Sequence, residues 1–354
     1  MKYDIITIGG ATEDIAFFTK EGVIIDNKKD LTKQKLFAFE YGAKIKVDKS
    51  FSNFGGGAAN SAVSFANLGF NVATLVAIGE DDRGQRIVNN FKQQKVDVSL
   101  VQKISKTESG FSFLLVGPAN EHIVFSNRAA NNQLSITNYE LRIIKDAKWV
   151  YLASLSDQWQ KILDKVCSLI DISSAKDYNF AGVKIVWNPG HRQILSGLKT
   201  IGKYLSKVSV LIINKDEAIE LVMSDKNCKN KKRDFFEEIN NLLSVLYSYG
   251  PQIVLITKGK DGVNAFDGKK VYFQQAIKGV KQVDTTGVGD AFGSSFIAGL
   301  ELYQGDIKKA LYLGVKNAAS VVSKQGAQNG LLKQESKIFL LSFPPQLAGG
   351  IHFI

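Results

Sequence analysis

The chain has 354 residues, 45% of them hydrophobic and 22% charged, and a formal net charge of +11 at pH 7. This composition is ordinary for a globular protein of one large or two small domains. No apolar run approaches the roughly 18 residues of a membrane-spanning helix, and the acid-containing N-terminus does not read as a signal peptide, so we expect no membrane partner and a cytoplasmic location. With three histidines and two cysteines, a His-based zinc site or a Ser-His-Asp hydrolase is not expected.

The positive charge raises the question of a nucleic-acid partner. Much of it lies in loop-like segments, such as 28–35 and 226–233, in which no aromatic residues interleave with the lysines as stacking platforms would require. Runs of charge of this kind are usually solvated loops. We therefore expect no nucleic-acid partner, although a basic surface would help to attract polyphosphate substrates.

Short apolar runs alternate with helical patterns along the chain. The predicted strands are 5–8, 72–78, 148–153, 184–187, 208–213 and 253–257. The predicted helices are 57–68, 83–94, 157–170, 216–222 and 235–249. Strands separated by helices predict an α/β fold with a doubly wound, mostly parallel sheet flanked by helices.

Other segments depart from this alternation. Residues 263–266 and 271–273 flank Asp267-Gly268 and predict a β-hairpin, and the chain from 290 to 323 reads as mostly helical. Strand-like pieces at 23–25 and 43–47, and a hairpin formed by 109–116 and 122–126, predict additional β-structure outside the main sheet.

The most informative motif is the segment 283–292, in which Gly287 and Gly289 precede Asp290 and a helical run. Glycines before a helix leave backbone N–H groups free to bind an anion, and the helix dipole adds positive charge there. A carboxylate beside a bound phosphate suits a base that accepts a proton from an attacking hydroxyl. Taken alone, the segment would be equally consistent with a turn and a capping aspartate.

This segment resembles the Asp-Thr-x-Gly-Ala-Gly-Asp signature of the PfkB, or ribokinase-like, family of sugar and nucleoside kinases, with Val288 in place of alanine. The resemblance implies transfer of the γ-phosphoryl group of ATP to a hydroxymethyl group. It implies that Asp290 is the general base and that the backbone around Gly287, Val288 and Gly289 holds the transferred phosphate.

A second motif, at residues 54–60, resembles the family's Gly-Gly-x-x-x-Asn signature. The resemblance implies that Gly55, Gly56 and Asn60 contact the acceptor, and that Asp14, after the first strand, binds two of its hydroxyls. A carboxylate suits a vicinal diol because it offers two acceptor oxygens in one plane. Gly57 stands where ribokinases usually carry lysine, so ribose, fructose, other furanoses, keto-deoxy sugar acids and purine nucleosides all remain open as acceptors.

The remaining motifs resemble the nucleotide and cation sites of the family. By this resemblance the ATP-binding residues are Asn188, Asn214, Thr257, Gly259, Gly262 and Asn317. Asn214 and Glu217 would hold Mg²⁺ through water, which suits a hard cation that keeps most of its waters. Many relatives bind K⁺ near the anion-binding loop, and Asp284 and Thr286 are the candidate ligands here.

The resemblance also implies how the chain is organised. A ribokinase-like kinase domain would span 1–332, with a small β-sheet lid from about 20–50 and 109–127, and a tail at 333–354 has no assigned role. A homodimer through the lid is one arrangement open to such a chain. A nucleoside kinase of the same family and a non-catalytic sugar- or nucleotide-sensing protein on the same fold remain as alternatives to a carbohydrate kinase.

Overall fold

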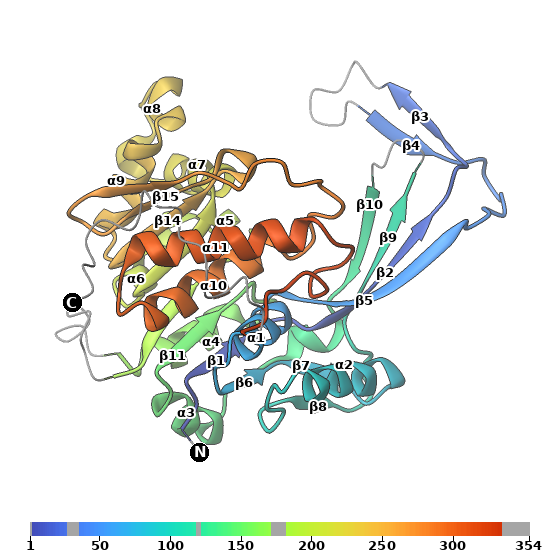
Figure 1. Cartoon of the computed structure of the whole chain (residues 1–354), viewed down its shortest axis with the longest axis horizontal. Coiled ribbons are helices and arrows are strands. Elements are labelled where there is room, and N and C mark those ends of the chain that lie inside the picture. Colours follow the sequence, from blue (N-terminus) through green and yellow to red (C-terminus); the bar gives the residue numbers. More distant parts are fainter. Residues whose placement is uncertain (1, 27–34, 118–121, 171–181, 335–354) are drawn as a thin grey trace, which may run out of the picture.

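The computed structural model describes residues 2–26, 35–117, 122–170 and 182–334 (Figure 1). Its centre is an eight-stranded sheet with the order β16-β15-β14-β13-β12-β11-β1-β6. The strands of this sheet are β1 (Ile5–Ile8), β6 (Val72–Leu75), β11 (Trp149–Leu152), β12 (Lys184–Trp187), β13 (Val210–Asn214), β14 (Ile253–Thr257), β15 (Val263–Phe266) and β16 (Val271–Gln274).

In this sheet the six strands β14, β13, β12, β11, β1 and β6 run parallel. At the other edge, β15 and β16 form the predicted hairpin, which adds to β14 in antiparallel orientation. The parallel strands are mostly apolar, as expected where both faces of a sheet are covered. In β14, for example, Ile253 and Leu255 belong to one hydrophobic core, whereas Val254 and Ile256 belong to the other. The predicted doubly wound α/β fold is confirmed.

Helices form a layer on each face of the sheet (Figure 1). One core packs against α1 (Gly57–Asn67), α2 (Asp82–Gln93), α10 (Val288–Leu302) and α11 (Ile307–Val322). The other packs against α3 (Asn138–Lys145), α4 (Trp159–Cys167), α5 (His191–Leu195), α6 (Gly197–Leu205), α7 (Lys215–Met223), α8 (Arg233–Glu237) and α9 (Ile239–Ser248). Short 3-10 turns are η1 (Ala129–Gln133), η2 (Lys226–Cys228) and η3 (Gly259–Asp261).

A second sheet projects from this body and forms the lid (Figure 1). Its order is β10-β9-β2-β5, with β2 and β9 parallel and the other pairs antiparallel. The lid strands are β2 (Thr12–Phe18), β5 (Lys49–Gly55), β9 (Phe111–Val116) and β10 (His122–Asn127). Two small pairs complete the strands, β3 (Val23–Asp26) with β4 (Lys35–Ala38) and β7 (Ala77–Gly79) with β8 (Gln102–Ile104).

Several predicted boundaries were wrong. Residues 43–47 form no strand, because the pairing with β2 begins only at Lys49. The predicted strand 72–78 divides, since after Val76 the chain leaves the edge of the main sheet and pairs with β8. The predicted helix 235–249 breaks at Glu238, whose extended backbone separates α8 from α9.

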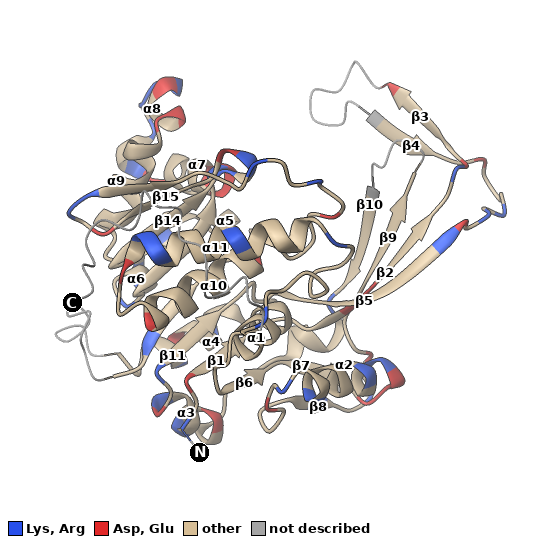
Figure 2. Ribbon diagram, in the orientation of Figure 1, with Lys and Arg blue, Asp and Glu red and all other residues tan. Residues whose placement is uncertain are grey.

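Lys and Arg residues occur on the body and the lid, interspersed with Asp and Glu, in the view of Figure 2. Among the described residues, no helix is both long and apolar enough to cross a membrane. Most of the tail at 333–354 lies outside the described residues, as does the turn of the β9–β10 hairpin.

Candidate active site

The predicted anion-binding loop leads directly into helix α10. Gly287 is the N-cap and adopts a left-handed backbone with φ 73°, and Asp290 is the third residue of the helix. A Cβ on Gly287 would lie 2.5 Å from the Cβ of Ala327, so both the conformation and the space require glycine. No side-chain capping hydrogen bond is made at this end, which argues against the reading of Asp290 as a helix cap.

Open space lies beside the first turn of α10. A Cβ on Gly289 would meet no atom within 4 Å. The first-turn N–H groups of a helix have no acceptor within the helix, and the dipole places partial positive charge there. The geometry therefore suits a bound anion next to Gly289.

The carboxyl group of Asp290 is partly buried and held in place. Asn60 Nδ2, from helix α1, donates to Asp290 Oδ2 at 2.9 Å. Burial raises the pKa of Asp290 to about 6, and the hydrogen bond from Asn60 opposes that rise. A carboxyl group with this pKa is ionised at pH 7 yet is a better proton acceptor than an ordinary aspartate.

Asp14 lies on lid strand β2 rather than in a solvated loop. Thr12 Oγ1 donates to Asp14 Oδ1 at 3.1 Å, and Ser112 of β9 is also hydrogen-bonded to the carboxylate. Burial raises the pKa of Asp14, an effect that these two hydroxyls oppose. A Cβ on Gly55 would lie 2.0 Å from Asp14 Oδ2, so Gly55 leaves the space that this carboxylate fills.

Gly56 links β5 to α1, which begins at Gly57, and this connection brings the motif at 54–60 next to Asp290. Gly56 has φ 93°, and a Cβ there would lie 2.4 Å from the carbonyl oxygen of Gly10. A Cβ on Gly57 would lie 3.0 Å from Ala153 Cβ and 3.3 Å from Asp290 Oδ1. Position 57 therefore adjoins the Asp290 carboxylate, and a Cβ there would require its neighbours to shift by a few tenths of an ångström.

The candidate K⁺ ligands lie on the loop before α10. Asp284 Oδ1 accepts from the backbone N–H of Thr286 at 2.8 Å. Asp284 Oδ2 accepts from Gln325 Nε2 at 2.7 Å and from the backbone N–H of Gly326 at 2.8 Å. The structure thus brings Asp284, Thr286 and Gly326 together through hydrogen bonds to the Asp284 carboxylate.

The predicted nucleotide residues follow neighbouring strands of the main sheet. Asn214 ends β13 directly opposite Thr257, the end of β14, and Asn188 follows β12. Ligands of open α/β sheets bind beyond such carboxyl ends. After Thr257, the chain reverses through η3. Position 262 requires glycine, because its φ is 90° and a Cβ there would lie 2.2 Å from the carbonyl oxygen of Gln274. Gly259 also has a positive φ, 56°.

Asn214 and Glu217 form a reciprocal cap on α7. Asn214 Oδ1 accepts from the Glu217 N–H, and Glu217 Oε2 accepts from the Asn214 N–H, both at 2.9 Å. Burial raises the pKa of Glu217. No group of three or more His, Cys, Asp or Glu side chains suited to a metal occurs in the described part of the chain. One capped carboxylate and one amide fit a hydrated Mg²⁺ reached through water better than a directly ligated ion.

The position of Asn317 speaks against its predicted contact with adenine. Its side chain is fully buried between α10 and α11, where Nδ2 donates to Ser295 Oγ at 2.6 Å and to Ser64 Oγ at 3.2 Å. Its Oδ1 accepts from the backbone N–H of Leu332 at 2.9 Å. With both ends of the amide engaged inside the core, Asn317 holds the two helices together.

Sequence reasoning missed three polar groups beside the site. Gln328 contacts Asn60, and Glu13 of β2 makes an ion pair with Arg86 of α2, with Glu13 Oε2 2.6 Å from Arg86 Nη2. Tyr151 of β11 is buried close enough to Asp290 to feel its charge. The pKa of the Tyr151 hydroxyl is raised mainly by burial and in addition by the charge of Asp290. Gln328, Arg86 and Tyr151 belong to no recognised motif, and Glu13, although it precedes Asp14, has its partner 73 residues away, so only the fold shows these contacts.

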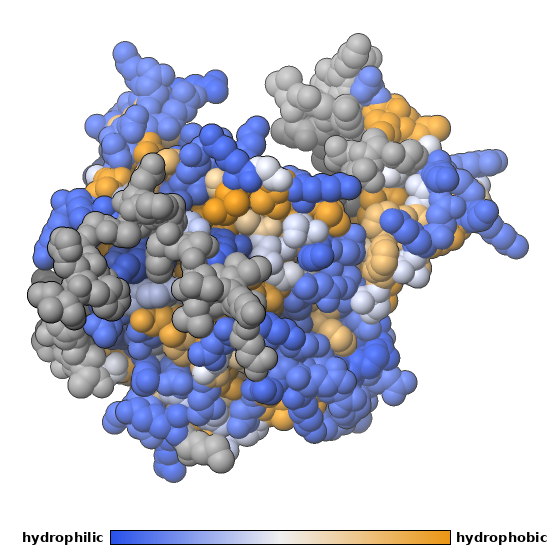
Figure 3. Space-filling view, viewed as in Figure 1, coloured by the Kyte–Doolittle hydropathy of each residue, from blue (hydrophilic) through white to orange (hydrophobic). Residues whose placement is uncertain are grey.

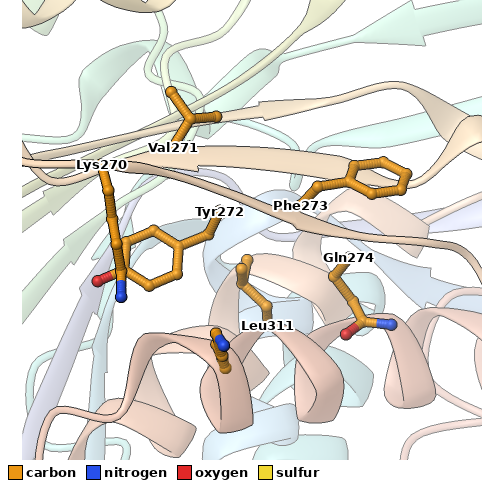
Figure 4. Close-up of a pocket in the computed structure, with 7 residues that line it drawn as sticks. Lys270, Val271, Tyr272, Phe273, Gln274 and Leu311 are labelled. Atoms are coloured by element: carbon orange, nitrogen blue, oxygen red, sulfur yellow. The ribbon is translucent and has the colours of Figure 1, made fainter. Parts of the chain in front are cut away.

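A pocket of about 370 Å³ lies elsewhere, between β16 and α11 (Figure 4). Figure 4 shows Tyr272 and Leu311 between this strand and this helix. The lining contains none of the predicted site residues, so this pocket is separate from the Asp290 site.

Comparison with known proteins shows the family of the chain. The model of the pfkB family of carbohydrate kinases matches residues 27–334. The chain is 30% identical over 296 residues to a ribokinase of Haemophilus influenzae, covering 81% of this chain and 87% of that protein. It is 24% identical over 336 residues to an ATP-dependent 6-phosphofructokinase of Thermoanaerobacterium thermosaccharolyticum, covering 92% and 90%.

Solved structures share the fold. A ribokinase of Arabidopsis thaliana complexed with ribose and ATP superposes with a TM-score of 0.78 at 19% identity, covering 97% of this chain and all of that one. A nucleoside kinase of Burkholderia thailandensis complexed with inosine gives 0.70 at 18% identity, covering 93% and 95%. The chain therefore belongs to the pfkB family of carbohydrate kinases, phosphotransferases that use an alcohol group as acceptor.

Proposed function

We propose that this protein transfers the γ-phosphoryl group of ATP to a hydroxymethyl group of a sugar or nucleoside, with Asp290 as the general base. One observation carries the proposal. Asp290, with its pKa raised to about 6, lies one residue beyond the open space at Gly289, at the N-terminus of α10. A base adjacent to an anion-binding helix end is what transfer of a phosphoryl group to an alcohol requires.

In the proposed reaction, the Asp290 carboxylate accepts the hydroxyl proton as the acceptor oxygen attacks the γ-phosphorus. The new O–P bond forms as the bond to the β-phosphate oxygen breaks, and ADP leaves. First-turn N–H groups of α10, around Val288 and Gly289, stabilise the charge on the transferred group. Asp14 and Asn60 orient the acceptor, and the lid excludes water that would otherwise hydrolyse ATP.

ATP is the proposed donor because the ribokinase of similar fold is complexed with ATP and because Asn188, Asn214 and Thr257 line up at the carboxyl ends of adjacent strands. Mg²⁺ bound at the phosphates would neutralise the charge that develops there. Asn214 and Glu217 would hold its waters, and Asp284 with Thr286 would form part of a K⁺ site. The fit of these donor sets supports both assignments.

The acceptor can be a free sugar or a nucleoside. Similar structures include a ribokinase with ribose and a nucleoside kinase with inosine, so fold likeness favours neither. We propose a vicinal diol as the feature that Asp14 recognises, since both sugars and ribonucleosides carry one.

We further propose that the lid pairs with a second copy of the chain. The support is its exposed apolar surface, to which β3, β5 and β10 contribute Val23, Ile24, Ile25, Phe51, Ile123, Val124 and Phe125. Figure 3 shows apolar residues on this part of the molecule. Exposed apolar surface of this kind marks interaction sites in globular proteins.

A coupled ADP-release screen tests the proposed function. The panel contains ribose, fructose, keto-deoxy sugar acids, adenosine and inosine, each with ATP, Mg²⁺ and with or without K⁺. We expect one acceptor class to accelerate ADP release far above the rate without acceptor, and Asp290→Asn to abolish that stimulation. Binding of a sugar or nucleotide without stimulated turnover would instead favour a sensing protein.

A further inference from the structure

Gln328 belongs to none of the motifs described above, yet it lies next to the pair formed by Asn60 and Asp290. Its Nε2 donates to Asn60 Oδ1 at 3.1 Å, and its Oε1 accepts from Asn90 Nδ2, on helix α2, at 2.9 Å. Together with the 2.9 Å bond from Asn60 to Asp290, these contacts form a continuous chain of three side-chain amides that ends at the carboxylate.

We propose that Gln328 is a positioning residue for the general base, which fixes the Asn60 amide so that its nitrogen faces Asp290, and that Asn90 in turn fixes Gln328. This inference rests on the proposed function of Asp290.

These three hydrogen-bonded amides can fix one another's orientation because each amide carries a donor at one end and an acceptor at the other. If Asn60 turned over, its Oδ1 would face the Asp290 carboxylate, and two acceptors would meet without a proton between them. Asn60 and Asn90 are buried, so water cannot readily replace a lost partner. The orientation of Asn60 therefore depends on Gln328, and the orientation of Gln328 depends on Asn90.

The segment that carries Gln328 is itself anchored to the site on both sides. Gln325 and Gly326 donate to Asp284, on the loop that precedes α10. On the other side, Asn329 Nδ2 donates to Asn53 Oδ1 of lid strand β5 at 3.1 Å. Residues 325–329 thus hold the anion-binding loop and the lid root at the same time, which places the Gln328 amide accurately against Asn60.

The environment of Asp290 makes this orientation measurable. Among the described residues, the titratable neighbour that responds to its charge is Tyr151, from β11, and burial raises the pKa of that hydroxyl far above neutrality. Asn60 is the hydrogen-bond donor that lowers the pKa of Asp290. Reversing the Asn60 amide should therefore move the Asp290 titration upward.

Two substitutions should reverse the donor–acceptor orientation of the Asn60 amide, one at its direct partner Gln328 and one at Asn90, a further amide away from Asp290. Gln328→Glu replaces the donor that faces Asn60 with an acceptor, so Asn60 must present its nitrogen to Glu and its oxygen to Asp290. Asn90→Asp acts two amides away, because an acceptor at 90 reverses Gln328 and, through it, Asn60. Gln102→Ala is the matched control, since Gln102 is also bonded at both amide ends, to Ser135 and Glu140, far from Asp290 along the chain.

The first measurement is the pH profile of kcat with the best acceptor. We expect Gln328→Glu to move the acid limb upward by about one pH unit, the equivalent of one charge-assisted hydrogen bond, so that kcat falls about fivefold at pH 6 and about tenfold well below it. Asn90→Asp should shift the limb in the same direction by less, and Gln102→Ala should leave it unchanged. An unmoved limb in both acidic variants would overturn the proposal.

The second measurement needs no substrate and separates this inference from the proposed function. With ¹³C-labelled aspartate carboxyl groups, the Asp290 signal is identified by its loss in Asp290→Asn and is titrated in the free protein. An upward shift in the uncharged variant Gln328→Leu, which removes the donor to Asn60, as well as in Gln328→Glu and Asn90→Asp supports the amide chain even if no acceptor in the panel is phosphorylated. The uncharged variant is included because added charge alone would raise the Asp290 pKa only in the acidic variants. Unchanged titration in the folded Gln328→Leu variant would show that Gln328 only fills space.

Discussion

The end of α10 and the root of the lid each present an aspartate to the site, but they hold it differently. Asp290 belongs to a helix packed in the main core, and buried amides fix its carboxylate. Asp14 belongs to a strand of a sheet with large exposed surfaces, attached to the body by an ion pair in which Glu13 is buried and Arg86 is half exposed. If Asp290 is the base and Asp14 binds the acceptor, as proposed, the body positions the reacting group and the lid sheet positions the acceptor.

This difference predicts a division of kinetic effects. Substitutions around α10 should lower kcat with small changes in KM, because they alter groups that act in the transition state. Substitutions on the lid should act mainly on acceptor KM and on the competition between acceptor and water.

The largest expected effect is that of Asp290→Asn, which should lower kcat by at least about 100-fold, the lower bound for loss of general-base catalysis. The folded pKa of Asp290 is raised above its ordinary value, so its ionisation costs stability as pH rises through about 6. The variant should therefore keep or raise Tm at pH 7. Retention of more than a tenth of wild-type kcat would contradict the assignment.

Gly289→Val should lower kcat about 10²–10³-fold, the cost of one lost anion-hole donor, by filling the space proposed for the phosphate. The fold should survive, because a Cβ at this position meets no atom within 4 Å. Gly287→Ala is the informative contrast, since its Cβ would overlap Ala327 and should lower Tm. A folded Gly289→Val variant with a near-normal rate would show that the loop does not bind phosphate.

The α10 region was largely predictable because Gly287, Gly289, Asp290 and the helix are adjacent in sequence. In the main sheet, β1, β12 and β14 have the predicted bounds. The lid was less predictable. Its strand β2 carries Asp14 but lacks the alternation of a half-buried strand, because three polar residues are followed by four apolar ones, and it pairs with β5 and β9 from distant parts of the chain.

Long-range side-chain contacts were beyond sequence reasoning for the same reason. Gln328 lies 268 residues from Asn60, and Glu13 lies 73 residues from Arg86. Asn317 shows how packing bears on a residue that was singled out by its family position. Its family position suggested a ligand contact, whereas packing between α10 and α11 places it in the core, where its amide satisfies buried hydroxyls.

On the lid side, removing one hydroxyl of the acceptor diol should cost about 5- to 150-fold in kcat/KM, because one buried acceptor oxygen of Asp14 loses its partner. The comparison pairs ribo- and deoxy-forms of the best acceptor on the wild type and on Asp14→Ala. In Asp14→Ala the discrimination should disappear. Equal rates for both forms on the wild type, with Asp14→Ala also silent, would remove Asp14 from acceptor recognition.

The smallest expected effect is that of Arg86→Ala, which releases the lid root without touching the site. The hydrogen bonds from Arg86 lower the pKa of Glu13 against the opposing effect of burial, so the pair is formed at neutral pH. Because Arg86 is 51% exposed, the pair is worth little, and acceptor KM should rise by no more than about fivefold. ATP hydrolysis without acceptor should rise in parallel, since a loosened lid admits water. Arg233→Ala, which removes the exposed pair with Glu237 on α8, should change neither quantity. A fall in kcat with unchanged KM in Arg86→Ala would mean that the lid root and the base are not separable, and the contrast between the two regions would fail.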